Sequence, residues 1–145
     1  MDTVGREELI EALNMLLEAE RAGARVGAAL VHQAKGGAFE ALAGVIHDDE
    51  VRWSRALFEA LKAIGAEPSD KVGDFYDRTM AIGGLEDRLA FVNRGQGWVA
   101  RKLRELTPRL EAGPLRTTLE EMLEAHVVNI DAANRALQAA SPSDR

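Results

Sequence analysis

Apolar residues recur along the chain at alternating steps of four and three positions, the spacing that keeps them on one face of an α-helix. This pattern fills four long segments that are bounded by glycine, proline and polar clusters: residues 3–34, 39–64, 85–106 and 115–139. No segment alternates apolar and polar residues with a period of two, so we expect no strands. The sequence therefore predicts an all-α protein in which residues 1–145 form a single domain.

The lengths of the connections predict how the four helices are arranged. The connection over residues 66–84 is long, whereas those around residues 36–37 and 108–114 are short. A short link makes neighbouring helices antiparallel, and a long one can cross a bundle from end to end. We therefore expect a four-helix bundle with a long connection between helices two and three. Within that connection, Ser69 or Asp70 is expected to cap a short helix whose Phe75 and Met80 pack down.

Each apolar stripe is interrupted near its middle by a side chain that can bind a proton or a metal. These four residues are Glu20, Glu50, Gln96 and His126. Helices that pack with their midpoints level would bring all four to one depth, where an unpaired carboxylate is costly. The pattern predicts a shared polar site that either holds a metal or forms a closed network of Glu, Gln, His and water.

The stretches LLEAERAGARV, DDEVRW, NRGQGWVARKL and EEMLEAHVVNI resemble a small bacterial family of uncharacterised ferritin-like proteins. Di-iron members of the ferritin-like superfamily place one Glu on each of two helices and a Glu-x-x-His pair on each of the other two. The resemblance matches Glu20 to a single Glu, Glu50 to the Glu of one pair and His126 to the His of the other. Gln96 takes the place of the second single Glu.

Besides Gln96, two positions depart from the di-iron pattern. Trp53 stands where the resemblance expects a His, and Leu123 stands where it expects a Glu. Two Glu and one His cannot neutralise and bridge two cations, so we expect neither di-iron oxygen chemistry nor iron storage. The remaining residues imply one divalent metal (iron, zinc or manganese), with Gln96 or water completing its ligands and no organic cofactor.

Further polar residues lie close to these positions. His47 shares a helix face with the second-segment glutamate, but its acidic neighbours favour a solvated position. Asp49 is the alternative inward carboxylate on that helix, and Asn129 could orient a group of the site from one turn beyond the histidine. Glu18 and His32 are expected to face solvent.

The stretch NRGQGW, residues 93–98, places two glycines inside the third helix, where each costs about 1 kcal/mol relative to Ala. The favoured explanation is close approach of a neighbouring helix, and the first helix, whose Gly23 and Gly27 are similarly spaced, is a candidate for that neighbour. The alternative is that the glycines open space for a small ligand, with Trp53 or Trp98 forming a wall.

The alternative function is a non-catalytic interaction or scaffold protein in which the polar quartet only sets the register of the helices. Trp98, Phe75 and Tyr76 would then be exposed candidates for an interface. A third hypothesis is an enzyme that uses a carboxylate and the imidazole as acid and base. The sequence supports it least, since it contains no nucleophile motif and no phosphate loop.

Composition and charge argue against several classes of binding partner. Hydrophobic residues make up 46% and charged residues 29% of the chain, as in ordinary globular proteins. The net charge of −6 argues against nucleic acid and anionic membranes, and no apolar run reaches the length of about 18 residues that a membrane span needs. The chain has no cysteine, and its N-terminal MDTVGREELIEAL is unlike a secretory signal. We therefore expect a cytoplasmic protein, and symmetry preferences favour a homodimer.

Overall fold

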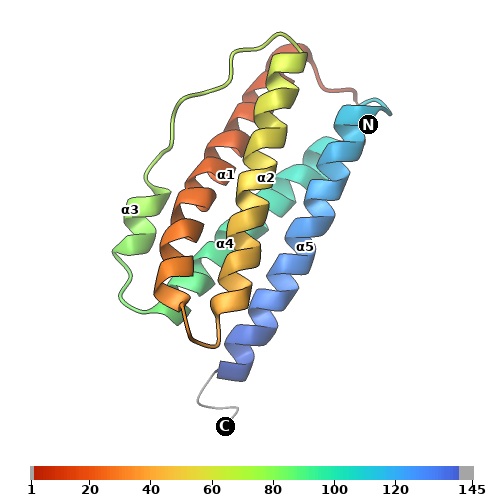
Figure 1. Ribbon diagram of the computed structural model, residues 1–145. Helices are drawn as coiled ribbons and strands as arrows, with labels where there is room; N and C mark the ends of the chain where they lie inside the picture. The colour runs from red at the N-terminus through yellow and green to blue at the C-terminus, as the bar shows by residue number, and fades with distance from the viewer. Residues whose placement is uncertain (1, 141–145) are drawn as a thin grey trace.

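The computed structural model describes residues 2–140, and their regular elements are all helical (Figure 1). Five α-helices and one 3₁₀ turn follow one another: α1 (Arg6–Ala34), α2 (Glu40–Ala63), α3 (Phe75–Met80), α4 (Leu85–Leu106), η1 (Thr107–Arg109) and α5 (Pro114–Ala140). No strand occurs between residues 2 and 140, so the prediction of an all-α chain is confirmed. Over the same range, no helix is long and apolar enough to cross a membrane.

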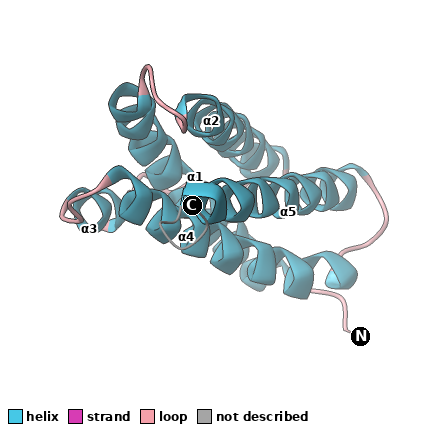
Figure 2. Ribbon diagram, turned by 90° about the horizontal axis from the view of Figure 1, so that it is seen from below, coloured by secondary structure: helices cyan, strands magenta, loops and turns pink. Residues whose placement is uncertain are grey.

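The long helices pack as two pairs, α1 with α2 and α4 with α5 (Figure 2). Each pair is antiparallel, because its connection is short and turns the chain back at one end. The segment between α2 and α4 instead runs along the side of α1 from one end of the molecule to the other and carries α3 (Figure 1). As a result, α4 starts at the end where α2 starts, and the two helices run in the same direction.

The predicted short helix in this segment exists, but the prediction of its cap was wrong. Asp74 precedes the first residue of α3, and no side chain caps the helix. Ser69 and Asp70 lie upstream in extended chain that is tied to α1. The Asn14 side chain accepts a hydrogen bond from the Ser69 backbone N–H at 2.7 Å, and Arg21 donates one to the Ser69 carbonyl at 2.8 Å. These side-chain bonds satisfy backbone groups that a helix would otherwise pair internally.

The core consists of two apolar clusters at different heights. The first includes Leu17 on α1, Trp53 on α2, Val99 on α4 and Met122 on α5. The second includes Val26 on α1, Ile46 on α2 and Val92 on α4. On α1, α2 and α4, the interval between the two clusters contains the residues predicted to interrupt the stripe: Glu20, Glu50 and Gln96. A polar layer therefore separates the two halves of the core.

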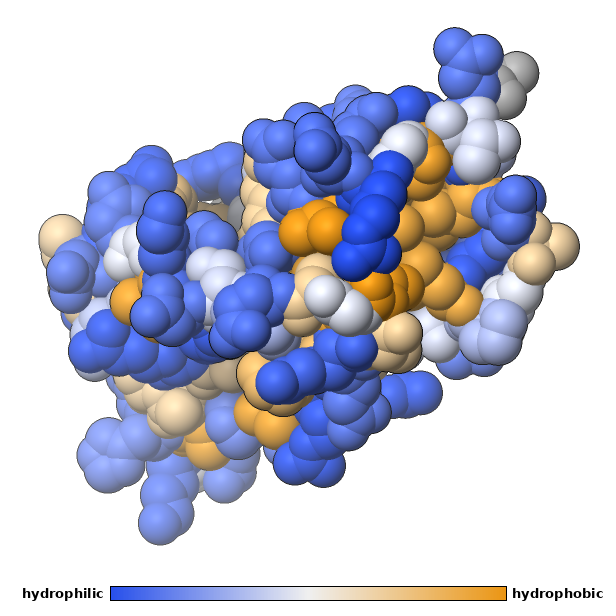
Figure 3. Space-filling model, turned by 90° about the horizontal axis from the view of Figure 1, so that it is seen from above, coloured by the Kyte–Doolittle hydropathy of each residue, from blue (hydrophilic) through white to orange (hydrophobic). Residues whose placement is uncertain are grey.

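The end of the molecule that carries the N-terminus has an apolar surface surrounded by hydrophilic residues (Figure 3). A cavity of about 450 Å³ lies at this end, and its lining includes Val4, Leu9, Ile64, Leu110 and Leu115. At 1.5 Å per residue, Leu9 lies about 16 Å along α1 from the polar layer, so this hollow is separate from it.

Candidate metal centre

Three ionisable side chains meet in the polar layer. Glu20 comes from α1, Glu50 from α2 and His126 from α5, and the three residues are 1%, 4% and 1% exposed. One potential ligand atom from each lies within 4.8 Å of those from the other two. Ligands that share one ion at about 2.0–2.2 Å lie roughly 3–4.4 Å apart. The three residues are thus close enough to bind a single metal ion.

The imidazole of His126 is oriented by the helix that carries it. Its Nδ1 lies 2.9 Å from the backbone carbonyl oxygen of Met122, one turn earlier on α5. A carbonyl only accepts hydrogen bonds, so Nδ1 carries the proton, and in the neutral ring Nε2 presents a lone pair. A metal-binding His is commonly held in this way through its other ring nitrogen.

The Nε2 lone pair points toward the carboxylates. The distance from His126 Nε2 to Glu20 Oε1 is 2.8 Å, and when Nδ1 holds the ring proton and Glu20 is ionised, neither atom has a proton to donate. Glu50 Oε2 is likewise buried without a partner. Buried polar atoms are rarely left unpaired, and here the unpaired atoms are one nitrogen and two oxygens, the donor types that divalent iron, zinc and manganese accept. The residues present therefore fit a metal ion.

A glycine on α1 makes room for Glu50. A Cβ built at Gly23 would lie 2.5 Å from Glu50 Oε2 and 2.8 Å from its carboxyl carbon. One helical turn later, a Cβ at Gly27 would lie 3.0 Å from the Cα of His47. Close packing of α1 against α2 explains these two glycines, and at Gly23 the missing side chain is also what admits the carboxylate.

Burial controls the charge of the two glutamates. The pKa of Glu20 is raised to about 8, because the increase caused by burial and by the charge of Asp49 exceeds the decrease caused by a hydrogen bond with Glu50. Burial also raises the pKa of Glu50 well above its ordinary value, and the charge of Glu20 and the hydrogen bond to it act in the same direction. Since that hydrogen bond stabilises the charged form of Glu20 and the neutral form of Glu50, Glu50 is the proton donor in the metal-free pair.

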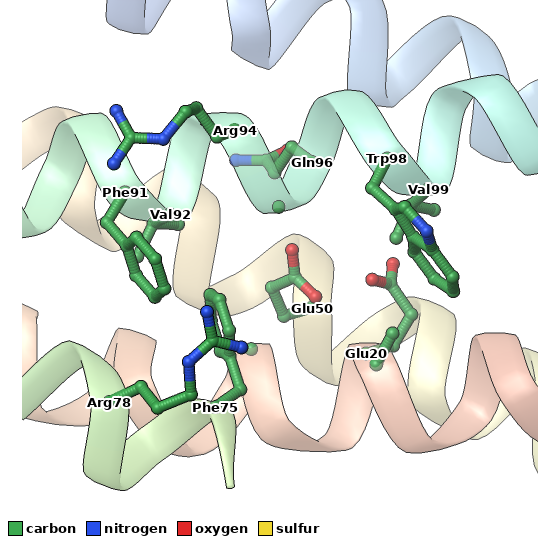
Figure 4. A pocket seen from close by; sticks show the side chains of 13 residues that line it. Glu20, Glu50, Phe75, Arg78, Phe91, Val92, Arg94, Gln96, Trp98 and Val99 are labelled. Carbon is green, nitrogen blue, oxygen red and sulfur yellow. The ribbon is translucent and has the colours of Figure 1, made fainter. Parts of the chain in front are cut away.

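A cavity of about 370 Å³ opens beside the carboxylates (Figure 4). Glu20 and Glu50 line its buried end, and Gln96, which is 3% exposed, reaches it from α4 on the opposite side. The amide nitrogen of Gln96 is buried without a hydrogen-bond partner. Gln96 thus lies in the polar layer, as the sequence predicts, and lines the same cavity as Glu20 and Glu50. His126 does not line the cavity.

The other polar candidates have different partners. Asp49 is half-buried and accepts a hydrogen bond of 2.8 Å from the side-chain amide of Asn129, so this pair joins α2 to α5 beside the centre. His47 contacts Asp48, with 3.3 Å between Nδ1 and Oδ1, and its side chain is one-third exposed. His32 is exposed, as predicted, whereas Glu18 is half-buried. Glu50, not Asp49, is the inward carboxylate of α2.

A neighbouring helix does approach the glycines of α4 closely at Gly95, but it is α3 and not α1. A Cβ at Gly95 would meet the Phe75 ring of α3 at 3.2 Å, whereas Gly23 and Gly27 face α2. Gly95 lines the cavity, which agrees with the alternative explanation, and Trp98 forms part of the wall. Trp53 is buried in the first apolar cluster instead.

The aromatic residues expected to be exposed are half-buried. Phe75 and Trp98 line the cavity, and Tyr76 lies under the guanidinium of Arg25, 3.9 Å from its ring centroid. Sequence reasoning missed Arg78, Phe91 and Arg94, which also line the cavity. The sequence offered one signal, namely that Phe91 and Arg94 shortly precede Gly95, but only the packing of α3 shows that these residues face a shared space.

The comparisons with known proteins identify a family but no activity. No curated protein and no solved structure matches the chain. A family model described as a domain of unknown function, DUF6306, matches residues 7–136, which include the three residues of the centre and the lining of the cavity. The chain therefore belongs to the DUF6306 family.

Proposed function

We propose that this DUF6306 domain is a ferritin-like four-helix bundle that binds one divalent metal ion through Glu20, Glu50 and His126. The observation that carries the proposal is the convergence of three buried side chains, one from each of three helices, whose potential ligand atoms lie within 4.8 Å of one another. A site of two carboxylates and one neutral imidazole balances the charge of a divalent ion. Iron, zinc and manganese all accept these ligands.

The arrangement of the helices supports the ferritin-like part of the proposal. Four long helices form two antiparallel pairs, and the long segment between the pairs runs from one end of the molecule to the other. Ferritin-like bundles have one such crossover and place their metal ligands at inward positions of the helices. Trp53 and Leu123 stand where a di-iron site would have two of its ligands. Both are apolar and belong to the first apolar cluster, which favours one metal rather than two.

The cavity favours a reactive site over a purely structural one. Structural metal sites are closed by protein ligands, whereas catalytic sites keep a position open for water or substrate. Glu20 and Glu50 line the cavity, so a small molecule that enters it reaches the ligand atoms. The bound metal would supply Lewis-acid chemistry to that molecule. Gln96, with an unpaired amide nitrogen, can donate a hydrogen bond to it.

Metal analysis of protein purified without chelator or affinity tag tests the proposal directly. We expect close to one iron, zinc or manganese ion per chain, either as purified or after addition of the metal. Glu50→Gln should lose the ion, because the amide keeps the shape of the side chain but carries no charge. Glu59→Gln is the matched control, since Glu59 is exposed on the same helix. Occupancy below about 0.1 per chain after addition of each metal would refute metal binding.

A scaffold whose polar quartet only sets helix register is the competing function. It requires the buried groups to satisfy one another, and the hydrogen bond between Glu50 and Glu20 does so in part. Glu50 Oε2 remains without a partner, which favours the metal. The homodimer and the cytoplasmic location stay predictions, and light scattering on purified protein measures the first of these.

A further inference from the structure

The cavity beside the metal centre has an aromatic wall. Phe75 and Phe91 stack with their ring centroids 5.2 Å apart and their planes 15° from parallel, and Trp98 stands nearer Glu20 (Figure 4). Gly95 contributes no side chain to this space. A volume of about 370 Å³ is at the lower end of the range of about 300–1,000 Å³ for small-molecule sites. The interior between entrance and carboxylates therefore suits a small apolar group.

Two arginines stand at the entrance of the cavity. The guanidinium carbons of Arg78 and Arg94 lie 5.3 and 5.5 Å from the centroid of the Phe91 ring. Arg78 is loosely paired with Asp74, at 4.0 Å between side chains that are 60% and 78% exposed. Arg94 has no ion pair among residues 2–140. Each guanidinium lies beside the Phe91 ring with little compensating charge, so each can receive an anion from solvent.

The two ends of the cavity thus differ in charge. The buried end has acidic side chains that coordinate metal in the proposed function, and the entrance has two cations. An organic anion with an apolar body fits the entrance, the aromatic wall and the buried end when its charged group stays at the entrance and its body lies against the aromatic rings. In this orientation the end of the ligand farthest from its charge faces the metal centre.

We propose that this cavity binds a small organic carboxylate with an apolar body, held by Arg78 and Arg94 at its charged end and directed toward the metal centre at its other end. The orientation rests on the proposed function, because the centre must hold a metal for the inner end of the ligand to meet one. Carboxylate binding at the arginines does not depend on it, so the two proposals can fail separately.

The first experiment compares 3-phenylpropionate with its neutral analogue 3-phenylpropanamide by isothermal titration calorimetry on the metal-free protein. The carboxylate should bind at least about tenfold more tightly, because each charge-assisted hydrogen bond to a guanidinium is stronger than its neutral counterpart. Quenching of tryptophan fluorescence provides a second signal, since Trp98 lines the cavity and Trp53 is the only other tryptophan. Equal affinities, or no saturable binding of either compound, would overturn the proposal.

Variants of the entrance test where the carboxylate binds. The Arg78→Gln/Arg94→Gln double variant should lose the roughly tenfold preference for 3-phenylpropionate while it keeps its affinity for the amide. Arg101→Gln is the matched control, because Arg101 is an exposed arginine of α4 that does not line the cavity. A double variant with an unchanged preference would exclude the two arginines as the anion site.

A change inside the cavity tests the position of the apolar body. Gly95→Leu should abolish binding of both compounds, because its Cβ already reaches the Phe75 ring and the rest of its side chain occupies the space. Gly97→Leu on the same helix is the control, since a Cβ there meets only the Arg101 side chain, at 3.7 Å. If both glycine variants fold by circular dichroism and Gly95→Leu still binds, the ligand lies elsewhere and the proposal is wrong.

Manganese tests the orientation and separates the two proposals. In Mn²⁺-loaded protein, paramagnetic relaxation should be strongest for the ring protons of 3-phenylpropionate and weakest for the methylene next to its carboxylate. The reverse order would mean that the carboxylate binds the metal, which would overturn the arginine-held orientation. If Mn²⁺ does not bind but 3-phenylpropionate does, the proposed metal site fails alone; if Mn²⁺ binds but 3-phenylpropionate does not, the carboxylate site fails alone.

Discussion

Metal binding at Glu20, Glu50 and His126 should release protons and should therefore strengthen steeply as the pH rises. In the metal-free protein, burial raises the pKa of Glu20 to about 8 and that of Glu50 well above its ordinary value. A metal ion coordinates the deprotonated carboxylate, so each carboxyl that is protonated beforehand must lose its proton on binding. The perturbation is a change of pH from about 6 to about 8.

The expected size of the effect follows from the pKa of Glu20. With a pKa of about 8, about 1% of this carboxyl is ionised near pH 6 and about half near pH 8, so the apparent affinity should rise about 50-fold from Glu20 alone. The carboxyl of Glu50 adds up to about tenfold per pH unit wherever it is also protonated. Between one and two protons should therefore leave the two glutamates for each metal ion bound near pH 6.

Isothermal titration calorimetry with Mn²⁺ measures this release. Titrations in two buffers with different ionisation enthalpies give the number of protons that leave the protein. The Glu59→Gln protein should behave like the parent, because Glu59 is exposed outside the centre. An affinity that stays constant between about pH 6 and pH 8, with no proton release, would show that the glutamates are not ligands or are already ionised.

Three further predictions concern the same layer. The metal-free protein should lose stability as the pH rises from about 5 to about 8, by up to about 1.4 kcal/mol per pH unit for each titrating carboxyl. The reason is that the folded state keeps protons on Glu20 and Glu50 that the unfolded chain releases. Urea titrations should show that the free energy of unfolding depends less on pH in the Glu20→Gln/Glu50→Gln variant than in the parent. Equal pH dependence in the two proteins would contradict the assignment. Gly23→Ala should weaken Mn²⁺ binding at least about tenfold, because its Cβ displaces the Glu50 carboxylate. Gly97→Ala is the control: calorimetry should show unchanged Mn²⁺ binding, and the protein should gain up to about 1 kcal/mol of stability. An equal loss of Mn²⁺ binding in both variants would refute displacement of the Glu50 carboxylate as the cause. His126→Leu should fold but should lose the rise in melting temperature that metal gives the parent protein, which at a free metal concentration of 100 times Kd corresponds to about 2.7 kcal/mol. If the rise persists, His126 is not a ligand.

Local information in the sequence was sufficient for the helices themselves. Helix boundaries follow from the period of the apolar residues and from glycine and proline, which are properties of neighbouring residues. The segment predicted over residues 85–106 has the bounds of α4, and the other long helices differ from their predictions by at most a few residues. The helix period also placed Glu20, Glu50, Gln96 and His126 on inward faces, and all four are buried.

Adjacent residues and distant contacts were harder to predict. Neighbours on a helix are separated by about 100° of rotation, so the period alone left Asp49 as an alternative to Glu50. The packing of α2 decides this choice, since it directs Glu50 toward Gly23 and brings Asp49 to Asn129. In the same way, the glycines of α1 were assigned to the wrong neighbour because their spacing does not specify which helix they face.

By itself, the sequence determined that the chain is all-helical, where its long helices lie and that Glu20, Glu50, Gln96 and His126 face the core, since each of these depends on spacing along one helix. Only the tertiary structure decided that Glu20, Glu50 and His126 come within reach of one ion while Gln96 lines a cavity. The same holds for the cavity itself, because it arises where α3, part of an irregular segment, packs over Gly95 of α4 and brings Phe75 and Arg78 beside Phe91. Such contacts depend on the relative position and rotation of separate helices, which no local pattern records.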